Sequence, residues 1–321
     1  MARFKILMFE TMHEAGTALL EQKCDLQYAE SLEQDYLVNA VKGKDGVIIR
    51  ANGAITRRMI EAGLPTLKVI GRHGVGLDAI DLVAAAELGI PVVNTPEANN
   101  VSVAEAFYAI TLGMAKRIKP GDAAVRANDW DYRNRHRTVG LSGKTLGVFG
   151  FGKIGQIIGR MGHFGYEMSV IYADAIAHPE AEKKLNAKRV SAEELFAAAD
   201  FISINLPLLP GTRKIVNASL INRMKPSAFL VNMARGPIWV EEDVAEALKN
   251  NRIAGAGSDV FEPEPPRVDC PLLKLDNFLC TPHNAAMTEE GMLNMSMVAK
   301  DMLAVLEGRK PDFPVPPPAA K

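Results

Sequence analysis

Three glycines near the middle of the chain constrain its fold more than any other feature. Gly150, Gly152 and Gly155 form a G-x-G-x-x-G run between an apolar, strand-like stretch at residues 145–149 and a helix-like stretch at residues 154–163. A second apolar stretch ends at Asp174, about 20 residues after the third glycine, which is the usual spacing of such an acid. A strand, a glycine turn, a helix and a strand ending in an acid together predict a dinucleotide-binding βαβ unit.

Each part of this pattern has a physical function. The first glycine permits a tight turn, the second leaves room for a pyrophosphate, and the third lets helix and strand pack closely. Free N–H groups at the helix start then hold the phosphate charge. Asp174 is expected to accept hydrogen bonds from the adenosine ribose; because no arginine follows it and a carboxylate repels a 2′-phosphate, the sequence favours NAD over NADP. The alternative is a glycine turn in an ordinary α/β domain, with Asp174 at a solvated strand end.

Length and composition limit the classes of protein to which the chain can belong. Its 321 residues suggest about two domains, and its formal net charge of −1 makes nucleic acid and membranes unexpected partners. The first ten residues are interpreted as a strand, because their apolar core is too short for a signal peptide or a membrane span. Cys24, Cys270 and Cys280 have no zinc-binding spacing, so we expect no metal, three unreactive thiols and a cytoplasmic protein.

Apolar segments alternate with helical patterns along most of the chain, which predicts an α/β fold with parallel sheets. The expected strands before residue 100 are residues 4–9, 25–29, 46–49, 67–70 and 91–93, and a helix is expected over residues 80–88. The expected strands after the glycine motif, including the one that precedes Asp174, are residues 168–173, 201–204, 229–231, 253–257 and 278–280. The second set is sufficient for a doubly wound sheet around the cofactor.

Two further helices define the expected domain organisation. Ser102 and Glu105 fit a capping box for a long apolar helix that Pro120-Gly121 would end, and this helix is expected between domains or at a subunit contact. A last helix over residues 289–306 is expected to pack on the N-terminal unit. The predicted domains are therefore residues 1–98 with 288–321, and residues 99–287. The tail, residues 311–321, carries five prolines and is expected to be loose or polyproline-like.

Four residues outside the glycine motif suit hydride transfer at a carbinol. Arg235, Asp259, Glu264 and His283 each follow a predicted strand, at the sheet edge where ligands bind in open parallel sheets. Histidine suits proton transfer near neutral pH, and a carboxylate such as Glu264 would fix its tautomer. An arginine offers a planar fork to a substrate carboxylate. The alternative is a histidine in a turn and an arginine in a surface ion pair.

The chain resembles the D-isomer-specific 2-hydroxyacid dehydrogenases, a family that includes D-3-phosphoglycerate dehydrogenase and the glyoxylate/hydroxypyruvate reductases. The resemblance covers about residues 45–290. Its carriers, besides the glycine motif, are residues 71–78 (GRHGVGLD), 94–96 (NTP), 102–105 (SVAE), 232–236 (NMARG), 258–262 (SDVFE) and 281–283 (TPH). It implies an α/β fold in which a doubly wound, parallel-sheet NAD-binding (Rossmann) domain is inserted in a smaller, discontinuous flavodoxin-like domain.

The resemblance also implies residue roles. His283 would be the acid/base, Glu264 its partner and Arg235 the substrate anchor, and Asp259 would lie near the nicotinamide. The residues expected to contact NAD are Gly150, Gly152, Lys153, Ile154, Gly155, Asp174, Leu206, Pro207, Thr212, Met233, Ala234, Arg235, Asp259, His283 and Ala286. The residues expected to contact a small 2-hydroxy or 2-oxo acid are Arg50, Arg72, Val75, Gly76, Arg235 and His283. A homodimer joined through the NAD-binding domains is expected.

The substrate remains open between two classes. Arg50 lies where phosphoglycerate-type members use arginine, but the second expected arginine is Asn52, so a phosphorylated or sulfonated acid and a small acid such as glyoxylate or hydroxypyruvate are both retained. A rival of another class is an NAD(H)-sensing, corepressor-like binding protein with the same fold. Feedback control by serine is not expected, because the chain ends soon after its last helix.

Overall fold

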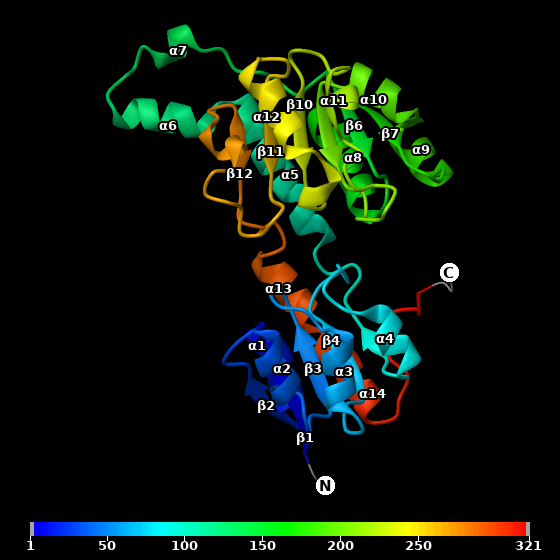
Figure 1. Ribbon diagram of the computed structural model, residues 1–321. Coiled ribbons are helices and arrows are strands. Elements are labelled where there is room, and N and C mark those ends of the chain that lie inside the picture. Colours follow the sequence, from blue (N-terminus) through cyan, green and yellow to red (C-terminus); the bar gives the residue numbers. More distant parts are fainter. Residues whose placement is uncertain (1–2, 319–321) are drawn as a thin grey trace. The chain divides into compact units, whose positions relative to one another are not determined.

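A parallel sheet lies at the centre of the larger of two units. The structure, a computed structural model, describes residues 3–318, and the chain divides into one unit ending at Asn99 and resuming at Met287, and a second unit, Asn100–Ala286. Within the described residues the larger unit has a seven-stranded sheet of order β12-β11-β10-β9-β6-β7-β8 (Figure 1). Its strands are β6 (Thr145–Phe149), β7 (Ser169–Ala173), β8 (Lys188–Arg189), β9 (Phe201–Ile204), β10 (Phe229–Asn232), β11 (Gly255–Ser258) and β12 (Phe278–Cys280).

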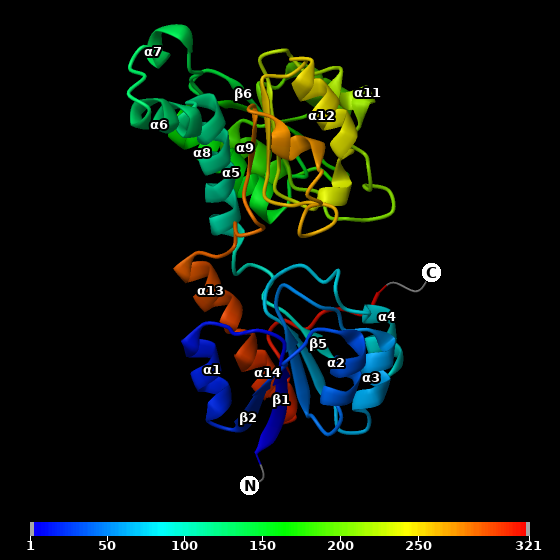
Figure 2. The same cartoon turned by 60° about the vertical axis from the view of Figure 1, so that its left-hand side comes forward.

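Helices cover both faces of this sheet. Figure 2 shows α5 and α8 on one side and α11 and α12 on the other, which matches two separate apolar clusters in the core. The helices are α5 (Asn100–Ala115), α6 (Ile118–Arg126), α7 (Tyr132–Arg135), α8 (Lys153–Tyr166), α9 (Pro179–Leu185), α10 (Ala192–Ala198), α11 (Ala218–Ile221) and α12 (Glu241–Lys249), with short 3₁₀ turns at Gly236–Ile238 and Pro271–Lys274. The strand order reverses beside β6, so the doubly wound fold is confirmed and its ligand edge lies at the end of β6.

The helix after residue 99 differs from the sequence prediction in three respects. Because α5 begins at Asn100, Ser102 lies inside its first turn and the predicted capping box is wrong. The helix ends at Ala115, and the left-handed Arg117 turns the chain into α6. Pro120 therefore sits in the first turn of a new helix, where its missing N–H costs nothing, instead of ending the previous one. The apolar face of α5 packs on α8 and on the sheet of its own unit.

The smaller unit is also a parallel α/β layer structure. Its described residues form a five-stranded sheet of order β2-β1-β3-β4-β5, which is the flavodoxin-like order. The strands are β1 (Phe4–Met8), β2 (Cys24–Tyr28), β3 (Gly46–Ile49), β4 (Val69–Arg72) and β5 (Val92–Val93). The helices are α1 (Glu14–Glu21), α2 (Gln34–Ala40), α3 (Arg57–Gly63), α4 (Leu82–Glu87), α13 (Glu289–Ser296) and α14 (Val298–Leu306).

The C-terminal segment of this unit is more ordered than the sequence suggested. The predicted last helix is two helices that break at Met297, and α14 packs on α1 and β4. The tail is docked: the amide of Val315 donates to the carbonyl of Val92 at 2.8 Å, and Pro314 bridges to Val93. The expectation of a loose tail is therefore wrong at these residues, while residues 319–321 lie outside the described part.

Residues 3–318 contain neither a membrane-spanning helix nor a cluster of metal ligands. None of the helices combines the length and apolar character needed to cross a bilayer. Across residues 3–318, no three or more His, Cys, Asp or Glu side chains come together in a way that could hold a metal ion.

Candidate active site

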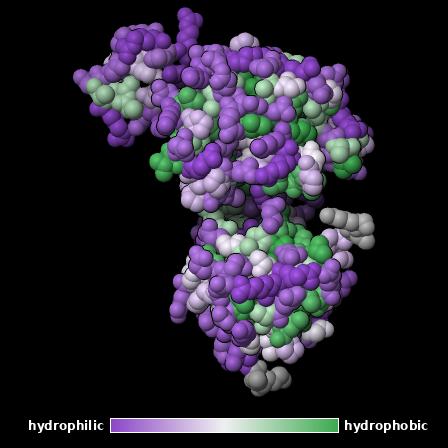
Figure 3. Space-filling view, viewed as in Figure 1, coloured by the Kyte–Doolittle hydropathy of each residue, from purple (hydrophilic) through white to green (hydrophobic). Residues whose placement is uncertain are grey.

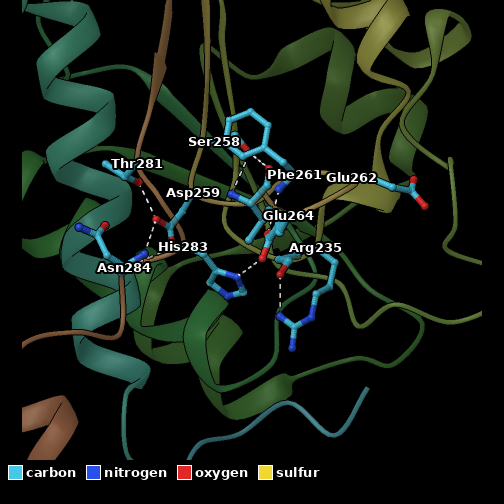
Figure 4. A network of polar contacts seen from close by, with 12 residues as sticks. Arg235, Ser258, Asp259, Phe261, Glu262, Glu264, Thr281, His283 and Asn284 are labelled. Carbon is cyan, nitrogen blue, oxygen red and sulfur yellow. Dashed lines mark hydrogen bonds and ion pairs between the residues drawn. The ribbon is translucent and has the colours of Figure 1, made fainter. Parts of the chain in front are cut away.

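Three loops at the carboxyl edge of the larger sheet bring the predicted catalytic residues together (Figure 4). Arg235 follows β10, Glu264 lies in the loop after β11, and His283 follows β12. The Nδ1 atom of His283 lies 2.6 Å from Oε2 of Glu264, and both side chains are partly exposed. With Nδ1 engaged by a carboxylate, the Nε2 atom is the ring nitrogen left to exchange a proton with a ligand.

The charge of Glu264 is fixed by its surroundings. Its Oε1 atom accepts a hydrogen bond from the Phe261 amide at 3.0 Å. Burial raises the pKa of Glu264, but the hydrogen bonds from His283 and Phe261 and the nearby charge of Arg235 outweigh it, so the pKa lies below its ordinary value. The carboxylate is therefore ionised at neutral pH and is an acceptor for a proton on Nδ1 of His283.

Asp259 holds the loop that carries His283. This carboxylate is 2% exposed, and its Oδ1 atom accepts hydrogen bonds from Thr281 Oγ1 at 2.6 Å and from the Asn284 amide at 2.9 Å. Its Oδ2 atom accepts from the Ala285 amide at 3.0 Å. His283 itself has a left-handed backbone, with φ of 52°, between these anchored neighbours. Residue types alone did not reveal this positioning contact of Asp259.

Gly236 lies where the Arg235 loop packs against the Glu264 loop. The sequence alone indicated no structural function for this glycine. A Cβ atom on Gly236 would lie 2.1 Å from the carbonyl carbon of Phe261, closer than any real contact. Buried Asn232 shapes the same turn, since its amide donates to the carbonyl of Arg235 at 2.9 Å and its Oδ1 accepts from the Ala234 amide at 3.0 Å. The Arg235 guanidinium donates to the Ala234 carbonyl at 2.7 Å. The signal in the sequence is the glycine directly after Arg235.

The glycine turn has the shape that a dinucleotide phosphate needs. Gly150 has φ of 94°, and a Cβ on Gly155 would lie 2.2 Å from the Gly150 carbonyl oxygen, so both positions require glycine. Gly152, by contrast, faces open space, where a ligand can approach its backbone. No side chain caps the start of α8, so its first N–H groups point toward that space.

Asp174 closes the other side of this turn. Its carboxylate accepts hydrogen bonds from the Phe151 amide at 2.6 Å and from the Ile176 amide at 3.1 Å. It also lines a pocket of about 640 Å³ with the predicted cofactor residues Leu206 and Thr212. Arg189 lines the same pocket and donates to the carbonyls of Asp174 and Ala175. Arg189 could not be recognised from the sequence, because only the pairing of β7 with β8 brings it beside Asp174.

The remaining predicted residues fall into two groups. Lys153 and Ile154 begin α8, Pro207 lies in the loop after β9, Met233 and Ala234 follow β10, and Ala286 ends the larger unit. The predicted substrate residues Arg50, Arg72, Val75 and Gly76 belong to the smaller unit. There, Arg72 Nε donates to the Gly76 carbonyl at 2.5 Å, and the Val75 carbonyl accepts from Asn94 at 3.2 Å.

Comparison with known proteins agrees with this geometry. Residues 108–285 match the family model described as the NAD binding domain of D-isomer specific 2-hydroxyacid dehydrogenases. The chain is 41% identical to a D-3-phosphoglycerate dehydrogenase of Methanocaldococcus jannaschii, over 95% of this chain and 58% of that protein. It is 38% identical to a hydroxypyruvate reductase of Thermotoga maritima, over 90% of this chain and 94% of that protein.

A solved structure, that of TT0316 protein from Thermus thermophilus, superposes with a TM-score of 0.91 at 32% identity, and the match covers 98% of this chain and 100% of that one. The chain spans only 49–58% of the length of four phosphoglycerate dehydrogenases that it matches. The larger unit is an NAD-binding domain, and the chain belongs to the D-isomer-specific 2-hydroxyacid dehydrogenase family.

Proposed function

We propose that this protein is an NAD-dependent oxidoreductase that interconverts a D-2-hydroxy acid and its 2-oxo acid. The observation that carries the proposal is the 2.6 Å contact between His283 and Glu264, on the sheet edge that also bears the glycine turn. Family membership supports the reaction class.

The residues of the larger unit fit NAD. The open backbone at Gly152 and the uncapped start of α8 would hold the pyrophosphate, and the Asp174 pocket would take the adenosine. When bound, NAD accepts the hydride from the alcohol carbon, and NADH returns one in the reverse direction. Asp174 contributes a negative charge that disfavours a 2′-phosphate.

His283 is assigned the proton transfer. In oxidation, its Nε2 atom takes the hydroxyl proton of the substrate; in reduction, the protonated ring gives that proton to the carbonyl oxygen. Glu264 stabilises the positive ring and keeps the Nδ1 proton in place, so it is a positioning residue. Arg235 is assigned the substrate carboxylate and the carbonyl oxygen, because its guanidinium offers planar donors and a positive charge. In the smaller unit, we assign substrate contacts to Arg50, Arg72, Val75 and Gly76.

The test is NADH oxidation with a panel of 2-oxo acids. We expect turnover of at least one of them, a loss of about 10²–10⁴-fold in kcat/KM for His283→Ala, and a comparable loss for Arg235→Ala. NADH fluorescence titration should give dissociation constants within a few fold of wild type. His163→Ala, on the far end of α8, is the matched control and should keep full activity. Absence of turnover with every oxo acid would favour the corepressor-like binding protein instead.

We further propose a homodimer joined through the larger unit. Figure 3 shows hydrophobic surface on the α6–α7 projection, and none of the residues of α6 is buried. Ile118, Val125 and Trp130 are each more than half exposed there. Contiguous exposed apolar side chains are typical of protein–protein contacts, and a second copy of the chain fits the family expectation.

A reducing compartment such as the cytoplasm is proposed from the cysteines. Within the described residues Cys24, Cys270 and Cys280 are unpaired, and burial raises the pKa of each thiol, most for Cys24, to about 11. Neutral, unreactive thiols suit a reduced cytoplasm. Cell fractionation with thiol labelling of the native protein tests this assignment.

A further inference from the structure

The topological switch point of the smaller sheet carries an internal ion pair. In the order β2-β1-β3-β4-β5, the chain leaves β1 toward both sides, and open α/β sheets bind ligands at the carboxyl ends of the two strands flanking such a point. Glu10 comes two residues after β1 ends, and Arg50 directly follows β3. The two side chains face each other there, with Arg50 Nη2 3.4 Å from Glu10 Oε1.

The carboxylate of Glu10 fills the anion-binding groups of the loop after β3. Its Oε2 atom accepts hydrogen bonds from the amides of Ala51 at 2.6 Å and Asn52 at 3.1 Å. Its Oε1 atom accepts from Asn52 Nδ2 at 2.9 Å. Burial raises the pKa of Glu10, but these hydrogen bonds and the charge of Arg50 outweigh it and hold the pKa below its ordinary value. The ionised Glu10 carboxylate therefore already occupies this site with one negative charge.

The neighbouring basic residues offer few free hydrogen-bond donors to an anion. Arg72 uses its guanidinium on the carbonyls of Gly76 and His73 within its own loop. His73 is 1% exposed, and burial, with the nearby charges of Arg50 and Arg72, lowers its pKa to about 4, so its ring is neutral at pH 7. A phosphate is normally held by several charge-assisted donors, whereas here Arg50 is paired with Glu10 and Arg72 is hydrogen-bonded within its own loop.

We propose that Glu10 makes this subsite select a substrate tail that is uncharged and offers a hydrogen-bond donor, such as a hydroxyl group, and reject a phosphate or sulfonate tail. The inference rests on the proposed oxidoreductase function. A hydroxyl can donate to Glu10 and accept from Arg50, so both partners of the pair stay satisfied. A phosphate would lie against a carboxylate of the same sign in a partly buried site, and such a contact discriminates strongly against the charged ligand.

The experiment compares hydroxypyruvate with its phosphate ester, 3-phosphohydroxypyruvate, on the full chain with NADH. For wild type, we expect kcat/KM for hydroxypyruvate to exceed that for the ester by at least about tenfold. Glu10→Gln keeps the size of the side chain and one oxygen that can accept from the Ala51 and Asn52 amides, but it removes the charge, and it should shrink that ratio by about tenfold or more. Asp45→Asn is the matched control, because Asp45 is a half-buried carboxylate paired with Lys68 just before β3, at the opposite edge of the sheet; its ratio should equal that of wild type.

A second measurement does not depend on any variant. D-glycerate should inhibit wild-type hydroxypyruvate reduction at lower concentration than 3-phosphoglycerate does. A wild-type preference for the ester, tighter inhibition by 3-phosphoglycerate, or an unaltered ratio in a folded Glu10→Gln protein would overturn the assignment of the tail subsite while leaving the dehydrogenase activity intact. Failure to reduce either compound or any other 2-oxo acid would instead refute the proposed function, and this inference with it.

Discussion

His283 Nδ1 and Glu264 Oε2 lie 2.6 Å apart although the two residues are 19 positions apart in the sequence. The loops that carry them follow neighbouring parallel strands, β12 and β11, so the register of the sheet sets their separation. The buried carboxylate of Asp259 hydrogen-bonds to the backbone on the far side of His283. The position of the imidazole is thus fixed twice: Glu264 contacts the ring, and Asp259 holds the backbone of the loop that carries His283.

Replacing Glu264 by glutamine tests the contribution of the charge. The amide keeps a hydrogen bond to Nδ1 but no longer stabilises the protonated ring, so kcat/KM for oxo-acid reduction should fall about 10–100-fold. Glu262→Gln is the control: the Glu262 side chain points away from His283 (Figure 4) and pairs with Arg213. An unchanged kcat/KM for Glu264→Gln would contradict the role assigned to the carboxylate.

Gly236→Ala should damage the active site without touching a catalytic group. The new methyl would collide with the backbone of Phe261, so the Arg235 and Glu264 loops must separate. We expect the variant to be destabilised by about 1–3 kcal/mol in urea unfolding and to lose most of its turnover. Gly165→Ala, at an exposed helical position with open space around it, should be neutral or slightly stabilising. Equal stability and activity of the two variants would exclude the steric argument.

Cofactor choice can be tested at the pocket beside β7. Asp174→Asn retains the shape of the side chain and removes the charge that repels a 2′-phosphate, so the preference for NADH over NADPH should narrow about 10–100-fold. Arg189→Ala should weaken NADPH more than NADH, because it removes a cation from the same pocket. Dissociation constants from NAD(P)H fluorescence measure both effects, and Glu180→Gln, exposed on α9, serves as the control. If the ratio of the NADH and NADPH dissociation constants were unchanged in Asp174→Asn, another group would distinguish the two cofactors.

The oligomeric state depends on the α6–α7 projection. If a second copy covers this surface, Val125→Asp buries a charge in the dimer interface and should convert the dimer to a monomer in analytical ultracentrifugation. Val268→Asp is the control: it places the same charge on a 98% exposed position in a loop of the same unit, and this variant should have the same association state as wild type. A wild-type monomer, or a dimer that survives Val125→Asp, would refute the proposed interface.

Asp200 should make stability depend on acid pH. Its carboxylate accepts from the Thr145 amide and from Lys225, each at 2.9 Å. Burial raises its pKa, but these partners outweigh it and leave the folded-state pKa below the ordinary value. Its contribution, about 1–2 kcal/mol, is therefore present above the ordinary pKa near 4 and is lost as pH falls through the folded pKa.

Asp200→Asn should accordingly destabilise the protein in urea at pH 7 and have a smaller effect near pH 3. Asp269→Asn removes an exposed carboxylate, whose side chain is 85% accessible, and should cost little at either pH. An equal loss of unfolding free energy for Asp200→Asn at both pH values would contradict the predicted dependence of stability on the ionisation of Asp200.

The strands were predictable where local sequence decides burial. Apolar runs such as 201–204 became β9 at the expected positions, and the carboxyl edges that carry His283 and Glu264 followed from the strand order. Long-range contacts were not predictable in the same way. The approach of Gly236 to Phe261, the pairing of Glu10 with Arg50 and the docking of Val315 on Val92 each join segments far apart in sequence. The break between α5 and α6 at Arg117 depends on one left-handed residue, and residues 115–118 (AKRI) include no glycine or proline that would mark it in the sequence.

The last helix of the smaller unit has a consequence for synthesis. Met302 on α14 contacts the glycine positions of β3 and β4, and with Val298 and Leu306 it covers apolar residues of that sheet. During synthesis, β5 ends at Val93, about 200 residues before α14 is made. At roughly 5–20 residues per second, about 10–40 s pass before α14 can pack on the sheet. The larger unit is one continuous segment of the chain, so its sheet has no such delay. The nascent N-terminal strands thus spend that interval with bare hydrophobic surface, the kind of target that chaperones hold.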